Sequence, residues 1–181
     1  TFSVTRSTAG KVVATTIQVG GTGYSAGAAT VDAPSEFSFG TTAISANAIQ
    51  IGSIPFAVND KVVYDNDGGS ENIGLTNGTT YYVIEVTQNP STVKLATSQG
   101  GSALTLTAGT SETHKLKGVQ AIITAAVDGT GSVTGFTITE AGTGYATAPS
   151  ITPAGGGNSF VGSSTIGSGV VEIAASGGGK W

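Results

Sequence analysis

A four-residue segment, Gly21-Thr22-Gly23-Tyr24, recurs 121 residues later as Gly142-Thr143-Gly144-Tyr145. Its surroundings recur as well, because Thr16-Ile17 precedes the first copy at the same distance as Thr137-Ile138 precedes the second. A run of small residues and a short strand-like segment follow each tyrosine. Self-similarity of this kind is the signature of a repeated structural unit, so we expect two copies of one short-stranded β repeat.

The glycines of these segments indicate turns, because glycine adopts a positive φ without a Cβ clash. We expect the rings of Tyr24 and Tyr145 to lie across the turn or the sheet edge of their own repeat. This structural role is favoured because both tyrosines occur in the same repeat context. The functional alternative is that the two rings stack on a sugar or a base.

The composition favours an all-β fold. Gly accounts for 29 of the 181 residues, charged residues for 10% and apolar residues for 38%. β-branched residues dominate the apolar set and strong helix formers are scarce, which is typical of short strands joined by glycine turns. The net charge of −4 and seven scattered Lys and Arg argue against nucleic acid as a partner. No apolar run approaches the ~20 residues of a membrane span, and no charged-then-apolar leader indicates a secretory precursor.

Residues 36–117 carry the strand and turn signals of a separate β module. The expected strands alternate apolar and polar residues or are rich in β-branched and aromatic residues: Ile44 to Ile51, Lys61 to Tyr64, Tyr81 to Thr87, Thr92 to Ala96, Ala103 to Thr107 and Thr113 to Leu116. Turn signals lie at 65–70 and at Asn77-Gly78. We expect a small barrel or sandwich of about six or seven strands.

The predicted organisation is nested. A discontinuous β-repeat domain, residues 1–35 and 118–181, flanks the inserted β module of residues 36–117. Because the two ends of an inserted module usually lie close together, such an insertion need not disrupt its host domain.

The sequence offers little catalytic chemistry. His114 is the only histidine and cysteine is absent, so a His-rich transition-metal site cannot be built. The neighbours of His114 look like a strand, and neither a pair of convergent carboxylates nor a phosphate-binding loop is evident. We therefore expect a protein that is not an enzyme and has no cofactor.

One loop has the composition of a weak calcium-site candidate. It places the carboxylates of Asp65, Asp67 and Glu71 within seven residues, and such oxygens suit a hard cation. The segment lacks the twelve-residue loop and terminal bidentate Glu of an EF-hand, so an ordinary turn rich in Asp and Asn is favoured over a metal site.

Several segments resemble proteins of tailed bacteriophages. A Val/Thr/Ile strand, Gly-Thr-Gly-Tyr, and the run from Ala148 to Thr152 before a Gly-rich loop resemble the glycine–tyrosine repeats in structural proteins of cyanobacterial and marine phages. The inserted module resembles a β module of phage and bacterial surface proteins, through the segments Asn59 to Tyr64, Gly74 to Ile84 and Thr92 to Ala96. The resemblance covers about half of the chain. It implies a virion or surface protein and supplies no catalytic residues.

Two functions are consistent with these features. The first is a non-enzymatic virion protein, a capsid decoration or cement protein that binds the major capsid protein on the outside of the shell as a symmetric homo-oligomer, for example a trimer. The second is a tail-fibre or adhesin module that binds host-surface glycan. The aromatic side chains to test for an interaction are Tyr24, Tyr145, Tyr64, Tyr81, Tyr82 and Trp181. Trp181, after a run of glycines, is either an anchor for a partner's pocket or part of a frayed end.

Overall fold

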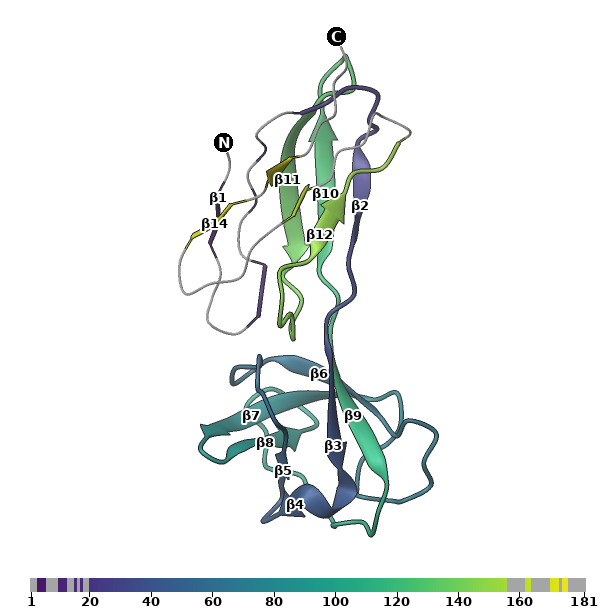
Figure 1. Ribbon diagram of the computed structural model, residues 1–181, viewed down its shortest axis with the longest axis vertical. Helices are drawn as coiled ribbons and strands as arrows, with labels where there is room; N and C mark the ends of the chain where they lie inside the picture. The colour runs from purple at the N-terminus through teal and green to yellow at the C-terminus, as the bar shows by residue number, and fades with distance from the viewer. Residues whose placement is uncertain are drawn as a thin grey trace. The chain divides into compact units, whose positions relative to one another are not determined.

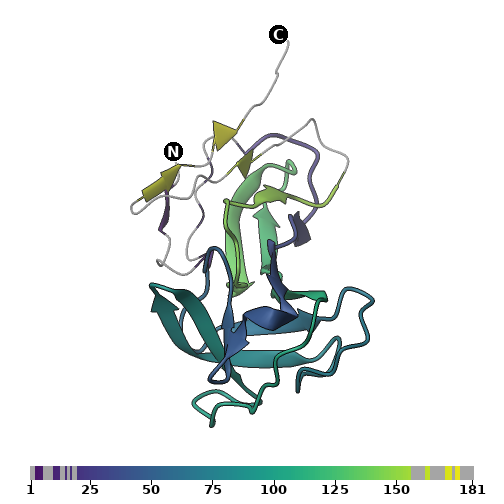
Figure 2. The same cartoon turned by 60° about the horizontal axis from the view of Figure 1, so that its bottom comes forward.

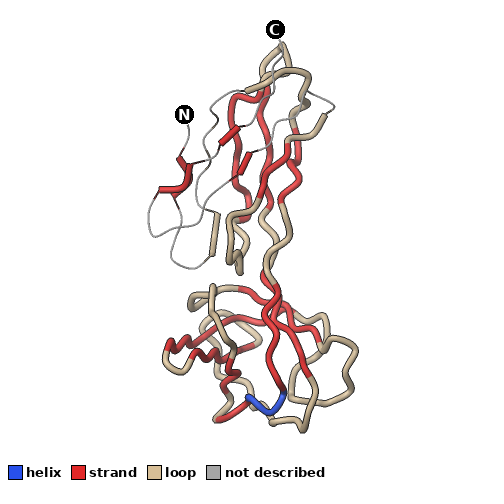
Figure 3. The backbone as a smooth tube through the Cα atoms, viewed as in Figure 1, coloured by secondary structure: helices blue, strands red, loops and turns tan. Residues whose placement is uncertain are grey.

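The computed structural model describes most of the chain, namely residues 3–5, 10–12, 15, 17, 20–155, 162–163, 170–172 and 174–175. The described residues form strands, turns and loops, with a single short 3₁₀ helix, η1 (Thr41–Ala43). The expected all-β fold class is confirmed (Figure 3). Among the described residues, no helix has the length and apolar character that a membrane span requires.

The chain divides into two compact units. The repeat unit comprises Thr1–Pro34 and Gln120–Trp181, and the inserted unit comprises Ser35–Val119 (Figure 1). The boundaries expected from the sequence, after residues 35 and 117, differ from these by one and two residues.

The repeat unit is built from short strands. They are β1 (Ser3–Thr5), β2 (Gly27–Val31), β10 (Ile122–Val127), β11 (Val133–Glu140), β12 (Ser150–Thr152), β13 (Gly162–Ser163), β14 (Val170–Glu172) and β15 (Ala174–Ala175). Six of them form an antiparallel sheet in the order β11-β10-β2-β12-β13-β15, and β1 pairs separately with β14. The strands of the first repeat and of the second are therefore neighbours in one sheet.

The two repeats exchange backbone hydrogen bonds reciprocally. The N–H of Val12 donates to the carbonyl of Ala141 at 3.0 Å, and the N–H of Val133 donates to the carbonyl of Gly20 at 2.8 Å. Adding 121 to Val12 gives Val133, and subtracting 121 from Ala141 gives Gly20. Each repeat therefore gives to the other the same bond that it receives, which is the pattern of an internal two-fold axis.

The two tyrosines of the repeat obey the same symmetry. The N–H of Tyr24 donates to Gly131 at 2.9 Å, and the N–H of Tyr145 donates to Gly10 at 3.3 Å. Tyr24 is 6% exposed in a cluster with Val133, and Tyr145 is 2% exposed in a cluster with Val12. The two rings therefore occupy equivalent settings inside the repeat unit, as the repeat predicts.

The axis passes close to the β2–β12 pair. Val31 pairs with Ile151, and Thr30 pairs with Thr152. Because the first copy is one residue longer after its tyrosine, Val31 corresponds to Ile151. When a residue pairs with its own equivalent across an antiparallel ladder, the local two-fold axis of that ladder passes between the two residues.

The inserted unit is a seven-stranded antiparallel sheet. Its strands are β3 (Glu36–Gly40), β4 (Ile44–Ser45), β5 (Ala48–Gln50), β6 (Lys61–Asp65), β7 (Thr80–Gln88), β8 (Ser91–Ala96) and β9 (Thr113–Gly118). Their order is β3-β9-β6-β7-β8-β5-β4, and the sheet curls into a half-barrel (Figure 2). The expected β module is thus an open half-barrel, since no ladder joins the edge strands β3 and β4 in the described residues.

Alternation along the strands fills the core of the inserted unit. On β6 the buried residues are Val62 and Tyr64, and on β7 they are Tyr81 and Val83. Successive side chains of a strand point to opposite faces, so every second residue enters the same core. The alternation in the sequence that predicted these strands therefore also decides which of their side chains pack in the core.

The prediction of one strand from Ile44 to Ile51 is wrong, because this segment forms a hairpin. β4 and β5 pair with each other across a turn at Ala46 and Asn47, which have φ values of 50° and 62°. Two successive positive φ angles are those of a type I′ hairpin turn. The Asn47 side chain also accepts the N–H of Leu106 at 3.0 Å.

The prediction of a strand from Ala103 to Thr107 is also wrong, because this segment is a loop between β8 and β9. Leu104 donates its N–H to Leu95, Leu106 to Asn47, and Thr107 to Ile73. Because these acceptors belong to separate segments, the alternating residues form no ladder. The alternation serves instead to bury Leu106, which is 8% exposed, against the core.

Candidate functional site

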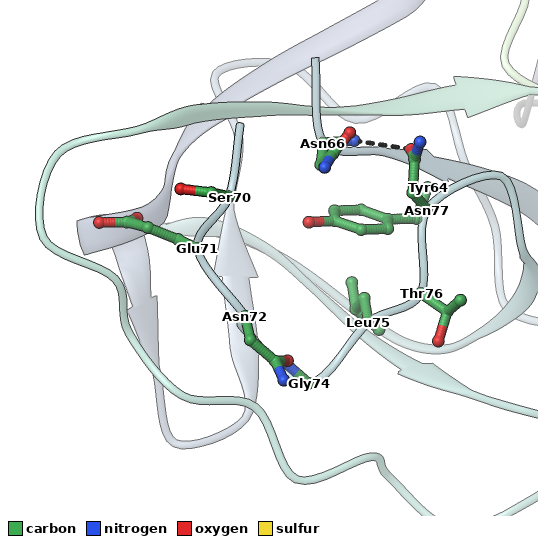
Figure 4. Close-up of a pocket in the computed structure, with 9 residues that line it drawn as sticks. All are labelled: Tyr64, Asn66, Ser70, Glu71, Asn72, Gly74, Leu75, Thr76 and Asn77. Atoms are coloured by element: carbon green, nitrogen blue, oxygen red, sulfur yellow. Dashed lines mark hydrogen bonds between the residues drawn. The ribbon is translucent and has the colours of Figure 1, made fainter. Parts of the chain in front are cut away.

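An open polar pocket lies beside the loop that connects β6 to β7. It has a volume of about 520 Å³. Its polar side chains all come from this loop: Asn66, Ser70, Glu71, Asn72, Thr76 and Asn77. Tyr64 and Leu75 contribute the apolar part of the lining, and Figure 4 shows the Tyr64 ring among the polar residues.

The pocket loop is held in place by a carboxylate from another loop. Glu112, just before β9, accepts the backbone N–H of Ser70 at 2.9 Å and that of Glu71 at 2.8 Å. These two N–H bonds, followed by the His114 ring, lower the pKa of Glu112 to about 2. A carboxylate that accepts several hydrogen bonds is stabilised in its charged form, so Glu112 is an anion at neutral pH.

Glu71 connects the same two loops, but here the carboxylate belongs to the pocket loop and the donors include Thr110 of the other loop. Its carboxylate accepts hydrogen bonds from the hydroxyls of Thr110 and Thr41 and from the backbone N–H of Thr110. These donors, the Thr110 hydroxyl first, lower the pKa of Glu71 to about 2. Glu71 and Glu112 therefore connect the 66–79 loop to the 97–112 loop through two separate sets of bonds.

A buried hydrogen-bond chain leads from the pocket lining to Glu112. The Tyr64 hydroxyl lies 2.6 Å from Nδ1 of His114, and Nε2 of His114 lies 3.1 Å from Glu112. A carboxylate can only accept, so Nε2 carries a proton and donates a hydrogen bond to Glu112. Nδ1 of a neutral ring is then an acceptor, and the Tyr64 hydroxyl donates to it.

This chain does not activate a nucleophile. Burial, and then the charge of Glu112, raises the pKa of Tyr64 to about 12, so the phenol stays protonated at neutral pH. The ring of His114 is 0% exposed and cannot meet a substrate directly. The arrangement therefore satisfies polar groups inside an apolar core and ties that core to the loops.

The carboxylates of the calcium candidate are not brought together. Asp65 forms an ion pair with Lys117 at 2.6 Å, and Asp67 forms one with Lys115 at 2.7 Å. Glu71 points to the 97–112 loop instead. In the part of the chain that the structure describes, no group of three His, Asp or Glu side chains is arranged to hold a metal ion.

Most of the aromatic interaction candidates are internal. Tyr24, Tyr64, Tyr81 and Tyr145 are 6% exposed or less, so their faces are covered and cannot stack on a ligand. Tyr82 is half-buried on β7, and Trp181 lies outside the described residues. Of the residues singled out in the sequence, the structure brings Tyr64 and Glu71 to the same pocket.

The hydroxyls of two of these tyrosines have structural partners. Tyr145 accepts the N–H of Ala121 at 2.9 Å and donates to the carbonyl of Asp32 at 3.2 Å. The Tyr81 hydroxyl accepts the N–H of Thr76 at 2.8 Å and so anchors the pocket loop to β7. The structural interpretation of the repeated tyrosine is the one that agrees with this geometry.

Sequence reasoning did not single out Glu112 or Asn72, and it identified Asn77 only as a turn residue. Asn72 accepts the N–H of Gly74 at 3.0 Å, and Asn77 accepts that of Asn66 at 3.0 Å. The turn signal around Asn77 could have identified it, because Asn commonly caps backbone groups within turns. Glu112 carries no such local signal, since its partners lie about 40 residues earlier.

Comparison of the chain with protein-family models, curated protein sequences and solved structures finds no match.

Proposed function

We propose that this protein is a non-enzymatic structural component of a tailed-phage virion, a decoration protein that binds the outside of the capsid shell. The observation that supports a non-catalytic role is the closed chain of Tyr64, His114 and Glu112. It uses the only histidine of the sequence, and each polar atom in it already has a partner. The virion setting rests on the resemblance of the repeat and of the inserted module to phage proteins.

The hydrogen bonds that hold the loops and the repeats in place suit a protein that binds an assembled shell with a rigid surface. Two carboxylates fix the long loops of the inserted unit, and reciprocal bonds between the repeats close the repeat unit. A binding surface that is already ordered loses less conformational entropy when it meets a partner. The net charge of −4 suits a position on the exterior of a shell, away from packaged DNA.

The partner in this proposal is the major capsid protein, and the bound form is a symmetric oligomer such as a trimer. Binding to the assembled lattice, and not to the unfolded or unassembled subunit, would stabilise the shell by mass action.

The test mixes the purified chain with DNA-filled shells that were assembled without it. We expect the chain to co-sediment with the shells at saturating stoichiometry and to raise the temperature at which they release DNA. Bovine serum albumin at the same concentration is the control for trapping in the pellet. If the chain stays in the supernatant while the shells pellet intact, the decoration role is wrong. Hydrolysis of a polysaccharide or ester substrate that is lost in His114→Ala would refute the non-enzymatic role.

A further inference from the structure

The polar pocket of the inserted unit has unused hydrogen-bond donors. Asn72 and Asn77 each use the side-chain oxygen to accept a backbone N–H, so the NH₂ groups of the two amides remain available as donors. In the described part of the chain, neither these groups nor the hydroxyl of Thr76 has a protein partner. All three side chains are exposed.

These donors are held in fixed positions. The backbone N–H of Gly74 orients the Asn72 amide, and that of Asn66 orients the Asn77 amide. In the view of Figure 4 the two amides lie on either side of the Tyr64 ring. The loop that carries them is anchored by Glu112 at one end and by Tyr81 at the other. A ligand would therefore meet donors that need little further ordering.

The charge of the pocket restricts its ligand. No Lys, Arg or His lines it, so nothing there would compensate a phosphate or a carboxylate. Its one carboxylate, Glu71, is already occupied by the two threonine hydroxyls. Amide and hydroxyl groups without a charged neighbour that is free to bind suit a neutral molecule with several hydroxyls.

We propose that this pocket binds a neutral sugar residue, with the side-chain amides of Asn72 and Asn77 donating hydrogen bonds to its hydroxyl oxygens. The volume of about 520 Å³ is within the range of small-molecule sites. The pocket is open, so the sugar can be one residue of a longer glycan. The proposal goes beyond shell attachment and does not depend on it.

The structure supplies variants that remove one donor and keep the loop. Asn72→Asp and Asn77→Asp retain an oxygen for the N–H of Gly74 or of Asn66 and replace only the NH₂ group. Thr76→Val removes the hydroxyl while its backbone N–H still bonds to Tyr81. Gln99→Glu makes the same change of charge at an exposed turn outside the pocket and is the matched control.

The experiment titrates the ¹⁵N-labelled full chain with neutral hexoses, N-acetylhexosamines and their disaccharides, and follows the side-chain amide signals of Asn72 and Asn77. We expect saturable shifts of both signals that do not depend on ionic strength, because the ligand is uncharged. Asn72→Asp and Asn77→Asp should each bind about 3- to 10-fold more weakly, the loss of one neutral hydrogen bond. Gln99→Glu should bind like the wild type. The backbone spectra of all variants establish that they are folded.

The proposal is overturned if none of these saccharides shifts the two amide signals at tens of millimolar, or if both Asp variants bind as tightly as the wild type. Triglycine with an acetylated N-terminus and an amidated C-terminus, a peptide probe without charge, represents the competing ligand class. If it shifts the same signals at lower concentration than every saccharide, the pocket is a peptide site and the sugar assignment is wrong. Shifts by disaccharides but not by monosaccharides would support an extended glycan as the source.

Discussion

The hydroxyl of Tyr64 donates to Nδ1 of His114 over 2.6 Å, and both side chains are buried. This bond places a polar pair beside the hydrophobic core of the inserted unit. Glu112 completes the pair at the other ring nitrogen and, through Ser70, fixes the pocket loop. The core and the candidate sugar site are therefore connected by a single path of hydrogen bonds.

Tyr64→Phe should destabilise the inserted unit. The substitution removes one hydroxyl and leaves Nδ1 of His114 buried without a donor, at a cost of about 1–3 kcal/mol in the free energy of unfolding. Urea unfolding followed by circular dichroism measures this difference. Tyr82→Phe is the matched control, because Tyr82 is half-buried on the neighbouring strand. Equal stability of the two variants would mean that the Tyr64–His114 bond contributes nothing.

Stability should fall in acid below the ordinary pKa of a glutamate. The folded-state pKa values of Glu71 and Glu112 are both lowered from 4.5 to about 2. A group with a lowered folded pKa stabilises the fold fully above its unfolded pKa, and that contribution is lost as the pH falls through the folded pKa. The denaturation midpoint should therefore drop between about pH 4.5 and pH 2.

Glu112→Gln should flatten this acid dependence, because its amide does not titrate and its NH₂ group cannot accept the backbone donors. Denaturant midpoints measured at several pH values test the change in slope. Glu85→Gln alters an exposed carboxylate that pairs with Lys94 on the surface, and its pH dependence should follow the wild type. An unchanged slope in Glu112→Gln would show that Glu112 is not linked to folding.

The repeat unit could be predicted from the sequence because its signals are local. Two copies of the same turn, with Gly21 and Gly142 at φ values of 61° and 65°, encode the same backbone and bury the same tyrosine. The strands β6 and β7 were equally predictable, since alternation decides which face of a strand is buried.

The parts that were missed depend on contacts distant in sequence. The hairpin turn at Ala46 and Asn47 has no glycine, so Asn47 is the only local sign of its two positive φ angles. The 103–107 segment alternates like a strand, but its partners lie in three separate segments. Nothing near Glu112 indicates that it accepts the N–H groups of a loop about 40 residues away. The candidate sugar site was beyond prediction for the same reason.

Gly21→Ala should destabilise the repeat unit by about 1–3 kcal/mol. A Cβ atom there would lie 2.7 Å from the Tyr24 ring, and the residue has a positive φ that alanine avoids. By the internal symmetry, Gly142→Ala, at a φ of 65°, should have a similar effect. Gly129→Ala is the control, since no atom lies within 4 Å of its added Cβ. Thermal unfolding measures all three, and a loss of stability in Gly129→Ala alone would contradict the prediction.

The inserted unit should fold when it is expressed alone as residues 35–119. All of its buried core residues lie within this range, and its first and last strands pair from Glu36 with Lys117 to Gly40 with Thr113. The N–H of Gly118 also donates to Ser35 at 3.4 Å, so the two ends of the unit meet. We expect a dispersed NMR spectrum and a cooperative unfolding transition. The shorter fragment 41–119 lacks β3, and with it Phe39, which is 3% exposed, so it should be markedly less stable. An unfolded 35–119 fragment would show that the repeat unit supplies part of the stability that the packing of the inserted unit accounts for by itself.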